Sequence, residues 1–130
     1  MKQRYHPKEI EATLHSVREL YPDKKITGIF QPHLFSRTRD LAEGFAKSLS
    51  LLDRLILLDI YPARENAIEG VSSELIYKNV VIKDKMMCSK EQLLETLQQL
   101  KIEVLVSLGA GDIDKYVILI KHLLTNRIIK

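Results

Sequence analysis

The chain has 130 residues, of which 45% are hydrophobic and 28% are charged. This composition is close to the globular average and excludes a disordered tail or a fibre, and the length predicts one domain over residues 1–130. The net charge of +3 comes from lysines and arginines scattered along the chain, a pattern that gives no evidence for a nucleic-acid partner.

The single cysteine, Cys88, excludes an internal disulfide and a cysteine zinc cluster. No stretch reaches the roughly 18 uninterrupted apolar residues of a membrane span, and no apolar run follows the positive residues at the start of the chain. These features predict a cytoplasmic protein with no membrane partner. Cys88 has no histidine near it in sequence, so we expect a small hydrophobic or exposed thiol rather than a nucleophile.

Helical and strand patterns alternate along the first half of the chain. Apolar residues at helical spacing predict a helix at 7–21, and a short apolar run predicts a strand at 26–30. The spacing of the next apolar residues predicts a second helix that includes 41–49. The run 55–60 has no polar alternation, which is typical of a strand covered on both faces, so we expect it to be central in a parallel sheet.

The second half continues the alternation. A capping-box pattern at 89–92 precedes a leucine-rich helical repeat. The predicted elements are a short helix at 72–77, a short strand at 80–82, a helix at 93–100, a strand at 104–108 and a closing helix at 113–124. Helices that alternate with apolar strands predict an α/β sandwich with a mainly parallel sheet.

In such a sheet, ligands gather outside the carboxyl ends of the strands, which directs attention to three loops. The first loop, at 31–40, contains His33 and Arg37 and leads into a helix. An arginine fork matches carboxylate or phosphate oxygens, and a helix N-terminus adds free N–H groups and a positive dipole end. Either this loop binds an anion, or Ser36 or Thr38 caps the helix and the arginines face water.

The second and third loops are open to two interpretations each. Asp59 either orients an arginine or a metal-bound water, or lies in a turn set by a Tyr-Pro pair with Arg64 and Glu65 simply exposed. Gly109 and Gly111 either let the backbone approach a ligand or form a tight turn, since a G-x-G pattern alone is weak.

Known catalytic patterns are missing from the sequence. It contains no G-x-x-x-x-G-K-[ST] phosphate loop, no G-x-S-x-G elbow and no H-E-x-x-H zinc motif. The sequence therefore predicts neither a catalytic set nor a metal site within this chain alone.

Three motifs follow one another along the chain: F-Q-P-H-L-F-S-R-T-R-D at 30–40, D-I-Y-P-A-R-E at 59–65 and L-G-A-G-D-I at 108–113. In order and spacing they resemble the signatures F-Q-P-H-x-[YF]-[ST]-R-T-[RK]-D, D-[VI]-Y-P-A-x-E and L-G-A-G-[DN]-[IV]. These signatures belong to the C-terminal domain of the UDP-N-acetylmuramate:L-alanine ligases, within the Mur ligase family. The resemblance covers essentially the whole chain and implies a Rossmann-like three-layer sandwich.

Members of this family also have an N-terminal UDP-binding domain and a central ATPase domain with a phosphate loop and magnesium ligands. The resemblance implies that these two domains are absent here, that they are partners of this one, and that the fragment alone is inactive. It implies UDP-N-acetylmuramate, L-alanine and ATP with Mg²⁺ as the ligands of the full-length enzyme. In the family reaction, ATP activates the muramoyl carboxylate to an acyl phosphate, which the alanine amine attacks to give an amide in peptidoglycan precursor synthesis.

The resemblance also implies roles for individual residues. His33 and Arg37 would face the nucleotide phosphates, the acyl phosphate or the alanine carboxylate. The substrate- or nucleotide-binding candidates are His33, Arg37, His6, Asp59, Gly109 and Gly111.

The chain departs from the family pattern at two places. Leu34 stands where many members carry an arginine. Of the family's D-D-Y-[AG]-H-H-P motif only His6-Pro7 remains, with Tyr5 at the position of the first histidine, and His6 is alternatively just the residue before the helix.

Two other classes of function stay open. A free-standing, non-catalytic α/β module would hold a small anion or nucleotide through His33, Arg37 and the Gly109 turn. A phospho-acceptor regulatory domain would use Asp59, but such sites need several clustered acidic groups with a metal, and this region offers few.

Overall fold

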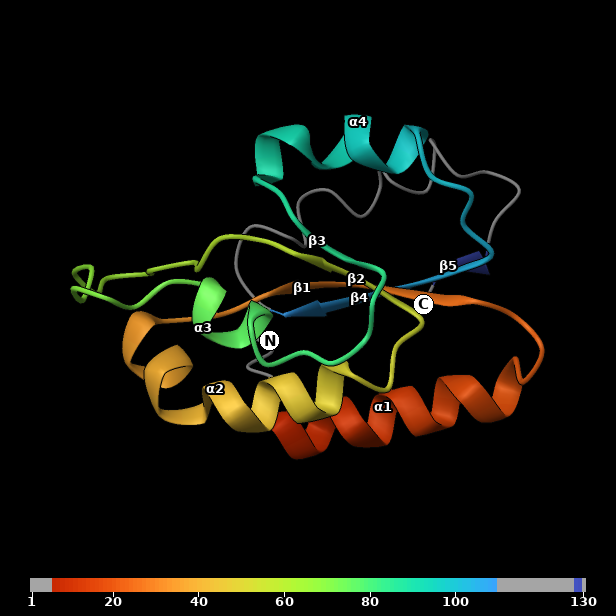
Figure 1. The fold of residues 1–130 in the computed structure, drawn as a ribbon, viewed down its shortest axis with the longest axis horizontal. Helices are drawn as coiled ribbons and strands as arrows, with labels where there is room; N and C mark the ends of the chain where they lie inside the picture. The colour runs from red at the N-terminus through yellow and green to blue at the C-terminus, as the bar shows by residue number, and fades with distance from the viewer. Residues whose placement is uncertain (1–5, 110–127, 130) are drawn as a thin grey trace.

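A parallel five-stranded sheet forms the middle layer of the computed structural model, which describes residues 6–109 and 128–129 (Figure 1). The strand order is β3-β2-β1-β4-β5, and every neighbouring pair runs parallel. The strands are β1 (Ile26–Gln31), β2 (Arg54–Leu57), β3 (Lys85–Met87), β4 (Val104–Gly109) and β5 (Ile128–Ile129).

Helices cover both faces of this sheet. On one face lie α1 (Pro7–Leu20), α2 (Phe35–Leu49) and α3 (Glu74–Tyr77), and on the other lies α4 (Leu93–Gln98), preceded by a 3₁₀ turn (Lys90–Gln92) (Figure 1). The predicted α/β sandwich with a parallel sheet flanked by helices is confirmed. Among the described residues, no helix is both long and apolar enough to cross a membrane.

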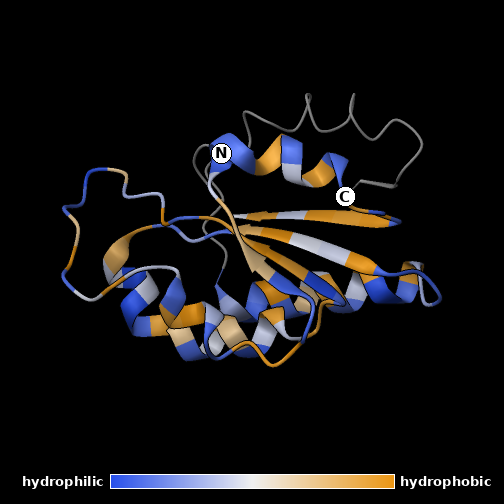
Figure 2. Cartoon of the chain, turned by 45° about the horizontal axis from the view of Figure 1, so that its top comes forward, coloured by the Kyte–Doolittle hydropathy of each residue, from blue (hydrophilic) through white to orange (hydrophobic). Residues whose placement is uncertain are grey.

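The core consists of two apolar clusters, one on each face of the sheet. Strand residues alternate between them because successive side chains of a strand point to opposite faces. In β2, Leu55 and Leu57 pack toward α1 and α2, whereas Ile56 packs toward α4. The inner strands are accordingly mostly hydrophobic along their length, while the helices mix hydrophobic and hydrophilic residues (Figure 2).

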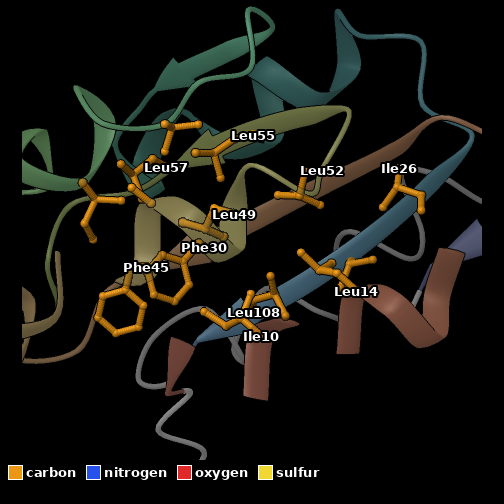
Figure 3. Packing of buried hydrophobic residues seen from close by; sticks show 14 of the residues in the cluster. Ile10, Leu14, Ile26, Phe30, Phe45, Leu49, Leu52, Leu55, Leu57 and Leu108 are labelled. Atoms are coloured by element: carbon orange, nitrogen blue, oxygen red, sulfur yellow. The ribbon is translucent and has the colours of Figure 1, made fainter. Parts of the chain in front are cut away.

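Aromatic and aliphatic side chains lock α2 onto β1. The rings of Phe30 and Phe45 meet at 5.1 Å between centroids and lie together beneath the sheet (Figure 3). At the same interface the Ser48 hydroxyl donates to the Pro7 carbonyl at 2.7 Å, which ties α2 to the start of α1. The C-terminal half of α2 is thereby fixed against β1 and the start of α1.

The structure confirms most of the predicted elements and corrects three. The strand predicted at 80–82 is wrong: the third strand is β3 at Lys85–Met87, while Val80 is buried and Val81 is 80% exposed. β2 is shorter than the predicted run, and although both its faces are covered, it lies second from the edge and β1 is central. α4 ends at Gln98, before the predicted position 100, and the helix predicted at 113–124 lies outside the described residues.

Candidate functional site

The strand order reverses direction between β1 and β4. The chain moves from β1 outward through β2 to β3 and then crosses to β4 on the other side of β1. A parallel sheet leaves a crevice outside the carboxyl ends of its strands at such a switch point. Gln31 and Gly109, the last residues of the two strands, are paired there.

The backbones of β1 and β4 approach closely at this crevice. Gly109 has a φ of +124°, and a Cβ atom built on it would lie 2.6 Å from the Gln31 carbonyl oxygen. Only glycine fits this conformation without a clash. The close approach observed at Gly109 is thus toward the Gln31 backbone, while its predicted approach to a ligand stays a prediction. Gly111 lies outside the described residues.

The loops after β1 and β2 are bonded to each other. The Tyr61 amide donates to the Pro32 carbonyl, and the Leu34 amide donates to the Tyr61 carbonyl, each at 2.8 Å. His33 pairs with Tyr61 in a single parallel bridge, and their rings stack with centroids 5.7 Å apart. These contacts extend the β1–β2 register beyond the strands and bury His33, which is 8% exposed.

Two residues of these loops adopt left-handed backbone conformations. Leu34 has φ 72° and ψ 138°, and Ala63 has φ 54°. Non-glycine residues rarely occupy positive φ, and such conformations persist where the surrounding structure holds them. Both residues line an open cleft of about 530 Å³ together with His33, Arg64 and Glu65.

The N-terminus of α2 is closed by Glu65. Its carboxylate accepts hydrogen bonds from the amides of Phe35, at 2.5 Å, and Ser36, at 3.0 Å, and from the Ser36 hydroxyl. These bonds, the one from the Ser36 hydroxyl foremost, hold the pKa of Glu65 below its usual value. The expectation that Ser36 or Thr38 caps the helix is wrong, because α2 begins at Phe35 and Leu34, its N-cap residue, makes no side-chain cap bond. The alternative of a simply exposed Glu65 is wrong as well, whereas Arg64 is exposed.

The structure brings only some of the candidate residues together. His33 lines the cleft, and Arg37 lies half-buried in the first turn of α2. Asp59 is exposed and lines a second pocket of about 380 Å³ with Gln31 and Tyr61. This pocket and the His33 cleft are lined by different residues.

His6 serves as the N-cap of α1. Its Nδ1 accepts a hydrogen bond from the Lys8 amide at 3.1 Å, and the Glu9 carboxylate accepts one from the His6 amide at 2.8 Å. This reciprocal pair is a capping box. The imidazole also borders a groove between α1 and α2, which is separate from the His33 cleft.

Two further observations concern reactive groups. Burial raises the pKa of the Cys88 thiol, which makes it a poor nucleophile. Within residues 6–109 and 128–129, no group of three His, Cys, Asp or Glu side chains is placed to hold a metal ion.

Residues 5–113 match the model of the family described as Mur ligase, glutamate ligase domain. The chain belongs to this family. The matched span includes the whole first and second motifs, whose loops are bonded to each other at the carboxyl edge of the sheet.

Two curated relatives of similar sequence carry the same name. The chain is 54% identical over 126 residues to the UDP-N-acetylmuramate--L-alanine ligase of Parabacteroides distasonis, covering 97% of this chain and 27% of that protein. It is 57% identical over 114 residues to the enzyme of the same name from Phocaeicola vulgatus, covering 87% and 25%. The chain thus spans about a quarter of the length of these relatives.

The fold is also found in a solved relative. The crystal structure of the UDP-N-acetylmuramate-alanine ligase of Thermotoga maritima superposes with a TM-score of 0.65 at 23% identity, over 94% of this chain and 25% of that one. At this identity the match supports the fold alone. The resemblance predicted from the three motifs is confirmed at the level of the family.

The sequence did not single out Glu65 or Tyr61 as parts of the site. Glu65 lies 29 residues from Ser36 along the chain, so no local pattern links the carboxylate to the helix. The available signal was the D-I-Y-P-A-R-E motif itself, which contains both residues.

Proposed function

We propose that this chain supplies the C-terminal part of a UDP-N-acetylmuramate:L-alanine ligase, working with UDP-binding and ATPase domains. The enzyme would form an amide bond between L-alanine and the muramoyl carboxylate at the expense of ATP, as a cytoplasmic step of peptidoglycan precursor synthesis. The single observation that carries this proposal is that the loops of the first two motifs are hydrogen-bonded to each other at the carboxyl edge of the sheet. The relatives' shared name supports the choice of substrate.

The chain's own contribution would be the binding of negative charge. Arg37 would offset charge on a phosphate or carboxylate group of the substrates, and the His33 ring, oriented by Tyr61, would donate a hydrogen bond to the same group. Mg²⁺ and ATP would be held by the ATPase domain, and we assign no metal-dependent step to this chain. Isolated, it would be inactive, because its sequence has no phosphate loop to hold ATP.

The structure gives no specific support to a free-standing anion-binding module. That alternative would hold the anion through His33, Arg37 and the Gly109 turn, and the helix amides of Phe35 and Ser36 that could add to such a site already donate to Glu65. A phospho-acceptor domain finds no support either, since no carboxylate cluster surrounds Asp59 among the described residues.

A chimera tests the proposal directly. The matching 126-residue segment of the Parabacteroides distasonis relative is replaced by this chain, and L-alanine-dependent phosphate release from ATP and UDP-N-acetylmuramate is measured. We expect a rate within about tenfold of the parent enzyme, since small misplacements of a site shared between domains reduce rates by that order. A chimera that folds, binds ATP and releases no phosphate would contradict the proposal.

A further inference from the structure

Glu65 lies at the N-terminus of α2, where the first amides of the helix have no partner within the helix itself. Its two carboxylate oxygens take up the amides of Phe35 and Ser36 and the Ser36 hydroxyl. A carboxylate at a helix N-terminus is stabilised by the helix dipole as well as by these bonds. The start of α2, at a residue with no side-chain cap of its own, thus depends on a side chain from another loop.

The loop that carries Glu65 is itself held in place. The Glu65 amide donates to the Pro62 carbonyl at 2.9 Å, and the intervening Ala63 takes up positive φ, which turns the chain back toward α2. Immediately before this turn, the Tyr61 amide donates to the Pro32 carbonyl and the Tyr61 carbonyl accepts from the Leu34 amide. The carboxylate therefore links two loops that are both fixed to the carboxyl edge of the sheet.

Arg37 lies immediately after the residues that Glu65 holds. It belongs to the same helical turn as Phe35 and Ser36, so the orientation of that turn determines where its guanidinium stands. The next residue, Thr38, fixes the turn from the other side, since its hydroxyl donates to the Leu34 carbonyl at 2.8 Å. The position of Arg37 is thus determined by Glu65 on one side and by the Leu34 carbonyl on the other.

We infer that Glu65 is a positioning residue, whose carboxylate holds the first turn of α2 so that Arg37 is presented to the anionic group of the substrates. The inference rests on the proposed function for the role of Arg37. It also restricts recognition: the helix amides are taken, so the substrate anion is bound by the side chains of Arg37 and His33 and not by the helix terminus. Glu65 itself touches no substrate.

The first experiment uses this chain as it is. Glu65→Gln keeps the length of the side chain but removes its charge, and Glu69→Gln makes the same change at an exposed position nearby. In ¹H–¹⁵N NMR spectra, we expect Glu65→Gln to shift the amides of Phe35 and Ser36 and the Arg37 Nε–H signal, and Glu69→Gln to leave all three in place. Unchanged signals in Glu65→Gln would overturn the inference, whatever the chain's activity.

The second experiment uses the chimera and asks whether Glu65 acts through Arg37. We expect Glu65→Gln to reduce kcat/KM by roughly ten- to a hundredfold, mainly by raising KM for the same substrate whose KM rises in Arg37→Ala. Adding Glu65→Gln to Arg37→Ala should then cause little further loss, because residues that act through one another are not additive. Ser36→Ala, which removes one of the three donors, should lie between wild type and Glu65→Gln.

Different results separate the inference from the proposed function. Losses that multiply in the double variant, or a lower kcat with no change in any KM, would overturn the positioning role while leaving the ligase proposal intact. A wild-type chimera that folds but is inactive would contradict the proposed function, and the NMR comparison would then still decide whether Glu65 holds the start of α2.

Discussion

Leu34 is the residue whose backbone conformation least suits its type. Its φ of 72° is forced by the hydrogen bond from its amide to Tyr61 and by the two bonds that its carbonyl accepts from Thr38. A side chain at such φ and ψ values is strained by contact between its Cβ and the backbone. The strained residue lies between His33 and the first turn of α2, so it sets the path of the chain through the candidate site.

This strain predicts the order of two substitutions. Leu34→Ala and Leu34→Gly both remove the leucine side chain, but only glycine also relieves the Cβ contact. We expect Leu34→Gly to be more stable than Leu34→Ala by about 1 kcal/mol, although glycine costs more conformational entropy elsewhere. Urea unfolding followed by circular dichroism measures both free energies, and an alanine variant at least as stable as the glycine variant would show that Leu34 is unstrained.

Arg37 and Arg39 lie on the same helix but in different surroundings. Arg37 is half-buried in the first turn of α2, whereas Arg39 is exposed and paired with Asp40 at 2.9 Å. In the chimera, we expect Arg37→Ala to lower kcat/KM by at least about tenfold while changing the free energy of unfolding by less than about 1 kcal/mol. Arg39→Ala serves as the matched control, and an equal loss of activity in both variants would remove the special role assigned to Arg37.

Among the helices and strands, apolar periodicity predicted those elements whose pattern follows from the burial of their own residues. The helical spacing at 7–21 correctly predicted a helix that packs one side on the sheet, and the unbroken apolar run after Arg54 correctly predicted a strand covered on both faces. Burial against a sheet requires these two patterns. β3 was missed because it is a short edge strand whose residues, Lys85 to Met87, have no period-2 pattern. Its position depends on pairing with β2, which a single segment of sequence does not encode.

The site divides in the same way between what the sequence predicts and what it does not. The loops after β1 and β2 were predicted from the topology of a parallel sheet, and the structure places them side by side. The hydrogen bonds that the Glu65 carboxylate accepts from the amides of Phe35 and Ser36 were not predicted, because they join residues about thirty positions apart that meet only in the folded chain. The contacts of His6 are local instead: it caps α1 through hydrogen bonds with Lys8 and Glu9, as expected for the residue just before a helix.

The amino ends of the strands are held by a cluster of charges. The Asp84 carboxylate accepts hydrogen bonds from Lys25 Nζ at 2.9 Å and Arg54 Nε at 3.0 Å, which links the loops before β1, β2 and β3. These bonds, that of Lys25 foremost, lower the pKa of Asp84. A carboxyl whose pKa is lowered by folding stabilises the fold above its unfolded pKa, and this contribution is lost as the pH falls through the folded pKa.

The sign of this effect gives a measurable difference. As the pH falls from about 5 to about 2, we expect the free energy of unfolding to decrease less in Asp84→Asn than in wild type, because the asparagine cannot be protonated. Asp23→Asn, at an exposed position, should follow the wild-type curve. Parallel curves for wild type and Asp84→Asn would show that the three-way cluster adds no pH-dependent stability.

At the scale of the whole molecule, the two ends of the sheet have different roles. The amino ends carry the ion pairs of Asp84 and of Asp53 with Arg18, whereas the carboxyl ends carry the bonded loops, the cleft and the strained Leu34. Stabilising contacts are thus separated from the face that would meet the other parts of a ligase. A chain that spans about a quarter of its relatives can present such a face without containing the whole site.

The central claim is that this chain supplies an indispensable part of a site shared with other domains. The most direct test measures L-alanine-dependent phosphate release from ATP and UDP-N-acetylmuramate by three samples: this chain, the remaining domains of the Parabacteroides distasonis relative, and the mixture of both. We predict turnover only in the mixture, rising to saturation as this chain is added. Equal turnover by the remaining domains with and without this chain would contradict the claim.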